Sequence, residues 1–306
     1  MIDILLATYN GERFLSEQID SIIQQSFQDW RLLVSDDGSQ DGTMDLLKKF
    51  QTRDSRIVLL PKSSCRLGVQ GNFSKLCEVA TAPYIMLCDQ DDQWFPNKIE
   101  ISLNALQNYE KKYSANMPLL VHSDLHVVDE SLKIISPSFW KYSRIDPKCS
   151  SLNRLLVQNV VTGCTSIINQ ALLKKASPIP SSACMHDWWL ALVASLFGKI
   201  EFIPAATMSY RQHSKNQLGA RPYGLGRIKQ EGFAVISKHK VQKAKQALQT
   251  YELEKRYGNE LSEYEKEILN GYKKYHSKSP IRRFHTIYRY DFYKHGFLRN
   301  ALNLFG

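Results

Sequence analysis

The sequence lacks the features of a secreted, membrane-spanning or zinc-binding chain. Six cysteines occur among 306 residues, without a C-x-x-C pair or a regular spacing, so neither a zinc site nor a disulfide framework is indicated. No apolar run reaches the ~20 residues that a membrane-spanning helix needs, and the first residues lack the basic start and cleavage site of a secretory signal. We therefore expect a globular, cytoplasmic protein with reduced thiols, either soluble or peripheral on the inner face of the cell membrane.

Most of the chain also lacks net charge. Residues 1–217 contain 22 Lys and Arg against 22 Asp and Glu, whereas residues 218–306 contain 18 against 8. The whole surplus of +10 therefore lies in the last part of the chain. This asymmetry predicts separate tasks for a neutral domain at 1–217 and a basic, mainly helical extension at 218–306.

Short β-rich segments alternate with amphipathic helical patterns in the first 125 residues, which predicts an α/β domain with a mostly parallel sheet. Strands are expected at Ile2–Thr8, Trp30–Ser35, Ile57–Leu60, Tyr84–Cys88 and Leu119–Ser123. Helices are expected to begin near Arg13, Gly42, Gly71 and Asn97. Later segments predict a helix at Leu152–Gln158, an apolar segment at Val160–Ile168, a helix at Asp187–Leu196, a strand at Ile200–Pro204 and helices beyond Gly226. Ligands of such sheets bind beyond the carboxyl ends of the strands, so residues that follow a strand are the candidates for chemistry.

An acidic run, Asp89-Gln90-Asp91-Asp92, follows the apolar strand expected at Tyr84–Cys88. Packed carboxylates repel one another, so at least one must stay protonated unless a cation lies among them. Hard oxygen ligands favour Mg²⁺ or Mn²⁺. The alternative is a helix N-terminus, where Asp side chains bind exposed amides. The run therefore predicts either a metal site or a helix cap.

A second acidic cluster, from Ser35 to Thr43, also lies between a strand and a helix. Asp41 and Thr43 belong to good turn and N-cap sequences, so we expect them to be structural. Asp36 and Asp37 lie closer to the strand end. A carboxylate there can accept hydrogen bonds from a base or a ribose.

Taken together, these motifs resemble those of family 2 glycosyltransferases, which have the α/β architecture called GT-A. The matching residues are Thr8-Tyr9-Asn10, Asp36-Asp37-Gly38-Ser39, Asp41-Gly42-Thr43, Asn72, Asp89-Gln90-Asp91-Asp92, Trp94, Pro96 and Lys98. Four motifs occur in the family's order, each at its expected strand end, over roughly residues 1–217. The resemblance implies a mostly parallel central sheet flanked by helices, with a helical C-terminal extension.

The resemblance also implies a binding site for a nucleotide-diphosphate sugar. Thr8 and Asp37 would hold the nucleotide, and Asp89 would contact the ribose or a metal. The whole implied set is Thr8, Tyr9, Asn10, Asp36, Asp37, Arg66, Asn72, Asp89, Gln90 and Arg211. For Arg66 three alternatives stay open: a phosphate partner, a nearby aspartate, or a solvated guanidinium.

His186-Asp187-Trp188-Trp189 lies where the family carries its catalytic base, so the resemblance implies that Asp187 takes the proton. A carboxylate at a helix start accepts hydrogen bonds from amides, which keep it ionised. Trp188 and Trp189 are compatible with stacking on an acceptor sugar, and buried packing is the alternative.

Tyr210-Arg211-Gln212-His213, followed by Asn216-Gln217, resembles the family's R-x-H element. The resemblance implies that Arg211 reaches phosphates, and that His213 and Asp91 bind Mn²⁺ or Mg²⁺. By itself, a single histidine is more often structural than a ligand.

The implied reaction is an inverting transfer, in which Asp187 deprotonates an acceptor hydroxyl that attacks the donor in line. Thr162 and Gly163 resemble a segment that faces the donor sugar and the acceptor, and a turn inside an apolar strand is the alternative. Among subgroups, the motifs look most like bacterial rhamnosyltransferases of surface-polysaccharide synthesis. That likeness implies dTDP-L-rhamnose as the donor and a glycan or lipid-linked acceptor.

The tail at residues 282–305 interleaves basic and aromatic side chains. They are Arg282, Arg283, Arg289, Lys294 and Arg299 with Phe284, Tyr288, Tyr290, Phe292, Tyr293 and Phe297. This mixture suits the surface of an anionic membrane. The alternative is a helical arm that packs on the catalytic domain or on a second subunit of a homo-oligomer.

Two functions from other classes compete with this interpretation. A sugar-phosphate nucleotidyltransferase would carry a glycine-rich phosphate loop after its first strand, where this chain has Ala7-Thr8-Tyr9-Asn10. A nucleic-acid-binding protein is suggested by the basic tail. The acidic strand ends would repel nucleic-acid phosphates, so we expect no nucleic-acid partner.

Overall fold

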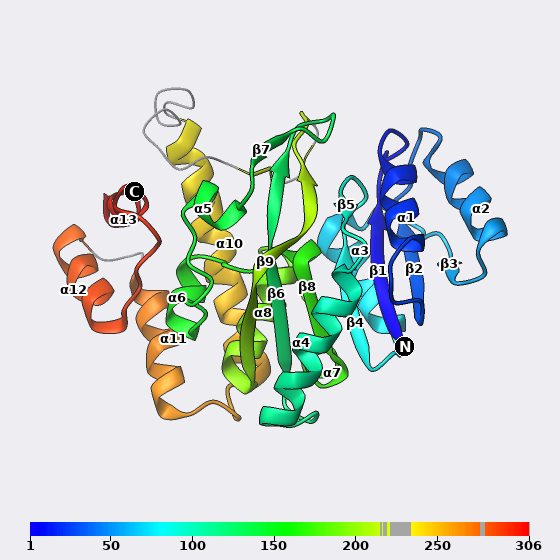
Figure 1. The fold of residues 1–306 in the computed structure, drawn as a ribbon. Helices are drawn as coiled ribbons and strands as arrows, with labels where there is room; N and C mark the ends of the chain where they lie inside the picture. Colours follow the sequence, from blue (N-terminus) through cyan, green and yellow to red (C-terminus); the bar gives the residue numbers. More distant parts are fainter. Residues whose placement is uncertain (215, 217–218, 221–233, 276–278, 306) are drawn as a thin grey trace.

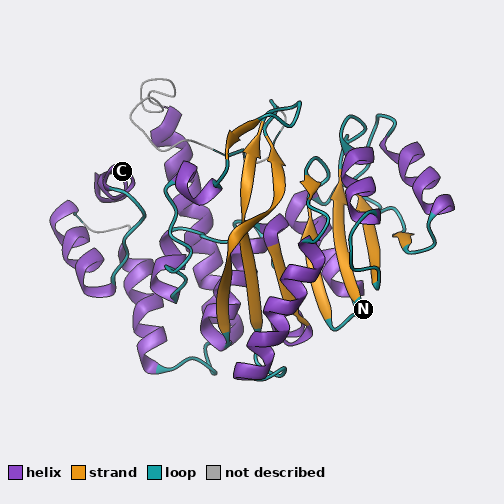
Figure 2. Cartoon of the chain, viewed as in Figure 1, coloured by secondary structure: helices purple, strands orange, loops and turns teal. Residues whose placement is uncertain are grey.

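The computed structural model describes residues 1–214, 216, 219–220, 234–275 and 279–305. Gln217, the last residue of the expected R-x-H element, lies outside the described residues. Helices flank one nine-stranded sheet in the described part of the chain (Figure 1, Figure 2). The strands are β1 (Ile2–Thr8), β2 (Trp30–Asp36), β3 (Ile57–Leu59), β4 (Tyr84–Cys88), β5 (Gln93–Trp94), β6 (Leu119–Val128), β7 (Ile134–Ser136), β8 (Ser166–Asn169) and β9 (Lys199–Arg211).

The helices lie largely where the sequence predicts them. They are α1 (Leu15–Ile23), α2 (Thr43–Arg53), α3 (Gly68–Val79), α4 (Lys98–Tyr113), α5 (Phe139–Ser143), α6 (Leu152–Val157), α7 (Gln170–Ala176), α8 (His186–Phe197), α10 (Ala234–Tyr257), α11 (Glu263–Tyr275), α12 (Pro280–Tyr290) and α13 (Phe297–Phe305), with the 3₁₀ turn η1 (Gly163–Thr165). None of the helices in the described residues is both long and apolar enough to cross a membrane.

The sheet has the order β3-β2-β1-β4-β8-β6-β9-β5, and β7 pairs with β6 beside this path. Strands β3, β2, β1 and β4 are mutually parallel, as are β6 and β9. Strands β8 and β5 are antiparallel to their neighbours. The parallel register places Thr8 of β1 beside Asp36 of β2. The carboxyl ends of β1, β2 and β4 therefore meet at one edge, which is where ligands bind in such sheets.

Two strands are longer than the sequence predicts. β6 continues beyond Ser123 to Val128, and β9 continues beyond Pro204 to Arg211. The pairing of β6 with β9 shifts register around Asp124 and then continues. This irregularity interrupts the strand pattern in the sequence, but the strands themselves go on. The extension matters because it carries the last residues of β9 to the carboxyl edge of the sheet.

The C-terminal helices pack onto the α/β part of the chain. One buried hydrophobic cluster contains Leu5 of β1 and Trp189 of α8 together with Leu253, Tyr272 and Phe292 from beyond residue 218. Each of these five side chains is 0–1% exposed. The structure therefore shows that the tail packs on the α/β part of the chain, which is one of the alternatives stated above. The division into two domains at 217/218 stays a prediction.

Candidate active site

The first strand-end turn holds Asp36 within the protein framework. Its Oδ1 accepts hydrogen bonds from the amides of Gly38 (3.0 Å) and Ser39 (2.8 Å), and its Oδ2 accepts one from Thr8 Oγ1 (2.9 Å). Gly38 has a φ of +85°, a conformation that glycine adopts without strain. Thr8 and Asp36 are therefore joined to each other here, and both shape the loop beside the nucleotide position implied by the resemblance.

Asp37 lies in a different environment, facing the loop before α3. Its carboxylate accepts hydrogen bonds from the amides of Leu67 (2.6 Å) and Gly68 (2.9 Å). Arg66 Nε lies 3.4 Å from Asp37 Oδ2, and the Arg66 guanidinium covers the Tyr9 ring at 3.6 Å. Of the three alternatives for Arg66, the structure shows the nearby aspartate, with the side chain still 61% exposed.

Three further residues expected to bind the nucleotide sugar bind the protein backbone. Gln90 accepts a hydrogen bond from the Tyr9 amide (2.8 Å) and donates one to the Tyr9 carbonyl (3.1 Å). Asn72 is 2% exposed and donates to the carbonyl of Ser35 (2.8 Å). Asn10 accepts from the Gln40 amide (2.8 Å). These side chains tie the ends of β1, β2 and β4 together, so their placement supports a positioning role.

Asp91 and His213 meet at the carboxyl edge of the sheet. Asp91 Oδ2 lies 2.7 Å from His213 Nε2, and the two side chains are 15% and 9% exposed. The Phe14 ring packs against the imidazole at 5.1 Å between ring centroids. A carboxylate oxygen suits Mg²⁺ or Mn²⁺, and an imidazole nitrogen favours a first-row transition ion such as Mn²⁺. The donor set therefore fits the implied metal.

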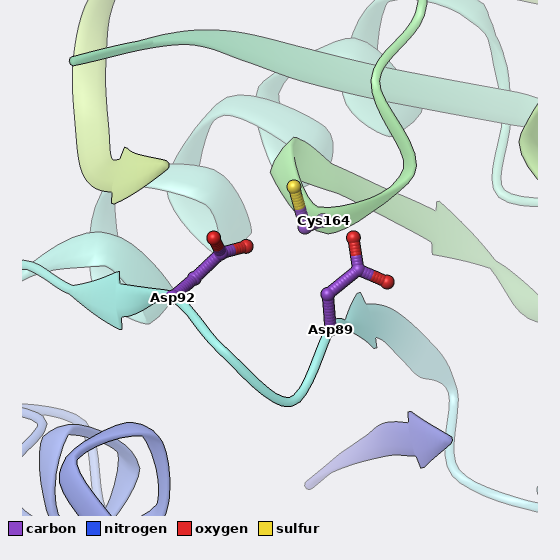
Figure 3. Close-up of side chains that lie close together, drawn as sticks. All are labelled: Asp89, Asp92 and Cys164. Atoms are coloured by element: carbon purple, nitrogen blue, oxygen red, sulfur yellow. The ribbon is translucent and has the colours of Figure 1, made fainter. Parts of the chain in front are cut away.

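A second group of possible ligands lies deeper, and consists of Asp89, Asp92 and Cys164 (Figure 3). One ligand atom from each lies within 4.8 Å of the others. Burial, followed by the charges of Asp91 and Asp89, raises the pKa of Asp92 well above its usual range. Burial also raises the pKa of the Cys164 thiol.

A buried lysine completes the surroundings of this deeper group. Lys98 is 0% exposed, donates to Thr207 Oγ1 (3.1 Å) and interacts electrostatically with Asp92. Burial lowers the pKa of Lys98 to about 8. A thiol is a soft ligand that Mg²⁺ and Mn²⁺ do not favour, and the Lys98 ammonium lies beside Asp92, so the group fits the implied metal poorly. We therefore place the metal at Asp91 and His213 in the proposal below.

The guanidinium of Arg211 is bound mainly within the protein. The residue is 1% exposed, and its guanidinium donates to the carbonyls of Asp91 (Nε, 3.0 Å) and Glu130 (Nη1, 2.5 Å). Its Nη2 pairs with Glu17 Oε2 at 2.6 Å, a contact that the sequence analysis missed. Three of the five N–H groups of this guanidinium are thus used within the protein. The structure shows Arg211 fixing the backbone of Asp91, and its contact with a phosphate stays a prediction.

Asp187 lies in the first turn of α8 and accepts two backbone hydrogen bonds. The donors are the amides of Gly163 (3.0 Å) and Trp188 (2.6 Å). Burial raises the pKa of Asp187 to about 6, and these hydrogen bonds oppose the shift. The amides favour the ionised carboxylate, but burial favours the protonated form and has the larger effect.

Asp89 shares the electrostatic environment of Asp187. Burial, then the charge of Asp91 and then that of Asp187, raise the pKa of Asp89 to about 7. The site thus joins a carboxyl after β4, a carboxyl on α8 and the pair formed by Asp91 and His213. Arrays of carboxyls with raised pKa values are typical of functional sites.

Both tryptophans of the His186–Trp189 run are buried. Trp188 is 7% exposed and donates to the Leu155 carbonyl (2.6 Å), and Trp189 is 0% exposed and donates to the Ala176 carbonyl (2.9 Å). Stacking of these indoles on an acceptor sugar is therefore wrong, and the packing alternative is correct. A fully buried indole has no face open to a ligand.

Thr162 and Gly163 form the start of a tight turn next to Asp187. The Thr162 carbonyl accepts a hydrogen bond from the Thr165 amide (3.0 Å). A Cβ on Gly163 would lie 3.0 Å from His186 Nε2 and 3.3 Å from Asp187 Cβ. The segment thus forms a turn that brings an amide to the Asp187 carboxylate, and its contact with donor or acceptor stays a prediction.

The fold and these strand-end carboxylates define a glycosyltransferase of GT-A architecture. A sequence profile described as Glycosyl transferase family 2 matches residues 3–145. The dTDP-rhamnosyl transferase RfbG of Shigella flexneri is 30% identical over 221 residues, which cover 70% of this chain and 74% of RfbG. The UDP-Glc:alpha-D-GlcNAc-diphosphoundecaprenol beta-1,3-glucosyltransferase WfgD of Escherichia coli is 27% identical over 178 residues, which cover 58% of this chain and 63% of WfgD. The chain belongs to glycosyltransferase family 2, and the predicted likeness to bacterial enzymes of polysaccharide synthesis is confirmed.

Solved structures confirm the predicted GT-A fold. S. aureus TarS 1-349 in complex with UDP superposes with a TM-score of 0.54 at 14% identity, over 99% of this chain and 88% of that one. The mannosyltransferase PcManGT from Pyrobaculum calidifontis, in complex with GDP-Man and Mn²⁺, gives a TM-score of 0.55 at 14% identity, over 99% and 87%. At such identities the likeness concerns the fold alone.

Proposed function

We propose that this glycosyltransferase moves a sugar from a nucleotide-diphosphate donor to a hydroxyl of a glycan or lipid-linked acceptor, with inversion at the anomeric carbon. The observation that carries the proposal is the meeting of Asp91 and His213, 2.7 Å apart. Asp89 and Asp187 interact electrostatically beside this pair. The arrangement supports a metal-assisted site where the loop after β4 meets the loop after β9.

In this proposal Asp91 and His213 hold Mn²⁺ or Mg²⁺, which would stabilise negative charge on the departing diphosphate. Asp187 takes the proton of the attacking acceptor hydroxyl, and a carboxylate with a pKa of about 6 is a suitable base near neutral pH. The amides of Gly163 and Trp188 aim that carboxylate. The proton ends on Asp187, and the acceptor oxygen forms the new glycosidic bond as the diphosphate leaves.

The nucleotide is proposed to bind across the ends of β1 and β2, near Asp37 and Tyr9. The Arg66 guanidinium now covers the Tyr9 ring at 3.6 Å and approaches Asp37, so a bound nucleobase would exchange these contacts for its own. Asp36, Asn72 and Gln90 contribute by holding the three strand ends in register. Asp89, one residue beyond β4, is proposed to bind a ribose hydroxyl.

The donor we favour is dTDP-L-rhamnose, because the relative RfbG is named a dTDP-rhamnosyl transferase. The relative WfgD is named for a UDP-Glc donor and a diphosphoundecaprenol acceptor, which supports a lipid-linked acceptor and leaves UDP-glucose as the second candidate donor. A lipid-linked acceptor would place the enzyme in the cytoplasm, at the inner face of the membrane, in the synthesis of capsule, O-antigen or a similar polysaccharide.

A thermal-shift panel tests the proposal. Melting temperature would be measured with dTDP-L-rhamnose, UDP-glucose and GDP-mannose, each with and without Mn²⁺, because a ligand that binds only the folded form raises it. We expect one donor to raise it by several degrees with Mn²⁺. The shift should be lost in Asp91→Asn and retained in Asp129→Asn, a half-buried turn residue between β6 and β7. An Asp91→Asn variant that binds Mn²⁺ and donor like the parent would refute the site.

A further inference from the structure

Helix α12 has two opposite faces with different surroundings. Thr286 and Ile287 are each 4% exposed and face the protein interior. Ile281, Phe284 and Tyr288 are 75%, 56% and 76% exposed. Residues at spacings of three, four and seven share one face of a helix, so these three side chains form a continuous apolar stripe that points outward. We call Ile281, Phe284 and Tyr288 the α12 stripe.

Basic side chains border the α12 stripe. Arg282, His285 and Arg289 are exposed and follow the stripe residues by one position along the helix. Arg289 pairs with Glu267 of α11 at 2.7 Å and is still 69% exposed. The stripe also belongs to the part of the chain that carries the whole surplus of +10. A partner of this face must therefore accept both apolar and positively charged groups.

Other basic and aromatic residues of the tail are occupied within the protein. Phe292 is 0% exposed in the hydrophobic core. Arg299 donates to the carbonyls of Ser143 (2.7 Å) and Arg144 (3.1 Å). Burial lowers the pKa of Lys294 to about 8. The basic and aromatic residues of the tail therefore have different surroundings in the folded chain, and the outer face of α12 combines exposed apolar and cationic groups.

The position of α12 leaves this face accessible in the described structure. Helices α12 and α13 lie at one edge of the molecule, opposite the edge formed by α2 and β3 (Figure 1). The face is built on a folded helix whose opposite side is anchored in the core, so docking would not require the helix to form first. A preformed amphipathic surface pays less ordering entropy on binding than a disordered one.

We propose that the outer face of α12 docks on an anionic lipid bilayer. Ile281, Phe284 and Tyr288 enter the boundary between headgroups and acyl chains, where aliphatic and aromatic side chains with a polar tip are favoured. Arg282 and Arg289 bind the anionic headgroups, and a positively charged segment gains further attraction from the surface potential. This surface lies outside the nucleotide-sugar site, so the proposal stands apart from the transferase chemistry.

Vesicle co-sedimentation of the full chain tests the proposal. The probes are vesicles of phosphatidylcholine alone and of phosphatidylcholine with about one third phosphatidylglycerol. We expect binding to the anionic vesicles only, weakened at least tenfold by Ile281→Ser/Phe284→Ser/Tyr288→Ser. Arg282→Gln/Arg289→Gln should weaken binding by about 30-fold, since each basic residue near an anionic surface contributes about 1 kcal/mol and every 1.4 kcal/mol is a factor of ten. Ile134→Ser/Ile135→Ser on β7, where these side chains are 54% and 49% exposed, is the matched control and should bind like the parent.

Three outcomes would overturn docking. The first is unchanged sedimentation of the triple variant, and the second is equal loss in the β7 control. The third is a parent dimer in analytical ultracentrifugation that the triple variant converts to monomer, because the face would then contact a second copy of the chain. Should the triple variant unfold, Ile281→Ser/Tyr288→Ser removes only the two most exposed side chains. Donor hydrolysis in solution should be unchanged in either variant, which separates a failure of docking from a failure of the active site.

Discussion

Asp91 Oδ2 lies 2.7 Å from His213 Nε2, although 122 positions separate the two residues in the chain. The contact is supported from both sides. Arg211, at the end of β9, donates to the Asp91 carbonyl at 3.0 Å, and the Asn216 side chain accepts from the His213 amide at 2.5 Å. The loop after β4 and the loop after β9 are thus held together by backbone contacts as well as by the pair itself.

The pH dependence of transfer should follow Asp187. Its pKa is raised to about 6 by burial, and a general base acts only when it is deprotonated. We expect kcat/KM to fall about tenfold per pH unit below pH 6 and to level off above about pH 7. The profile would be measured with saturating Mn²⁺ between pH 5 and 8.5. A flat profile down to pH 5 would assign the base to another group.

The raised pKa of Asp187 should also make the unfolding free energy depend on pH. A carboxyl whose folded pKa lies above its unfolded value stabilises the folded state at low pH, and this contribution is lost as pH rises from about 4 through about 6. Relative to the parent, Asp187→Asn should therefore gain up to about 3 kcal/mol of unfolding free energy between pH 4 and pH 7.5. Urea unfolding of both proteins at the two pH values gives this difference. If the difference in unfolding free energy between the two proteins does not change with pH, burial does not raise the pKa of Asp187.

Replacing Arg211 should show whether its side chain positions the Asp91 backbone or binds a phosphate. Arg211→Met removes the pair with Glu17 and the contact to the Asp91 carbonyl, so we expect a loss of about 2–4 kcal/mol of unfolding free energy. Mn²⁺ affinity, measured by electron paramagnetic resonance, should fall at least fivefold. The matched control is Arg31→Met, which breaks the pair between Arg31 and the 0% exposed Asp3 away from the site. That control should lose stability but keep Mn²⁺ affinity. Parent-like stability and Mn²⁺ affinity of Arg211→Met would contradict the positioning role of Arg211.

A single methyl group at Gly163 should disturb the base. The new Cβ would lie 3.0 Å from His186 Nε2 and 3.3 Å from Asp187 Cβ, so both side chains must move by a few tenths of an ångström. Since misplaced catalytic groups cost up to about 100-fold, we expect Gly163→Ala to lower kcat by 10- to 100-fold with donor affinity unchanged. Gly258→Ala, crowded by the Glu254 carbonyl at 2.6 Å in the C-terminal extension, should lower melting temperature only. Parent-like kcat in Gly163→Ala would contradict the positioning role of the turn.

The tryptophans of α8 should behave as core residues. Trp189 is 0% exposed and packs with Tyr257, so Trp189→Ala should cost about 3–5 kcal/mol of unfolding free energy. Trp189→Phe keeps much of the packing and should fold. Its acceptor KM should equal that of the parent, as measured in a transfer assay with saturating donor. A large rise in acceptor KM without loss of stability would return Trp189 to the acceptor site.

The strand-end motifs could be predicted from the sequence because they depend on local order. An apolar strand followed by Asp89 and Asp91, or by Asp36 and Asp37, places those residues at the carboxyl edge of a parallel sheet whatever the rest of the chain does. The family's order of motifs then gave Asp187 and His213. Side-chain direction was not predictable in the same way, since Asp36 faces its own turn while Asp37 faces the loop before α3.

The sequence by itself determined the alternation of strands and helices, the GT-A architecture, the family, and which segments carry the acidic residues and the histidine proposed to bind a metal. Only the tertiary structure decided which polar groups are already satisfied inside the protein. Arg211 is held by Glu17 and two carbonyls, both α8 indoles lie in the core, and in the tail Phe292 is buried whereas the α12 stripe is exposed. Burial and hydrogen-bond partners come from segments far apart in the chain, so no local pattern encodes them.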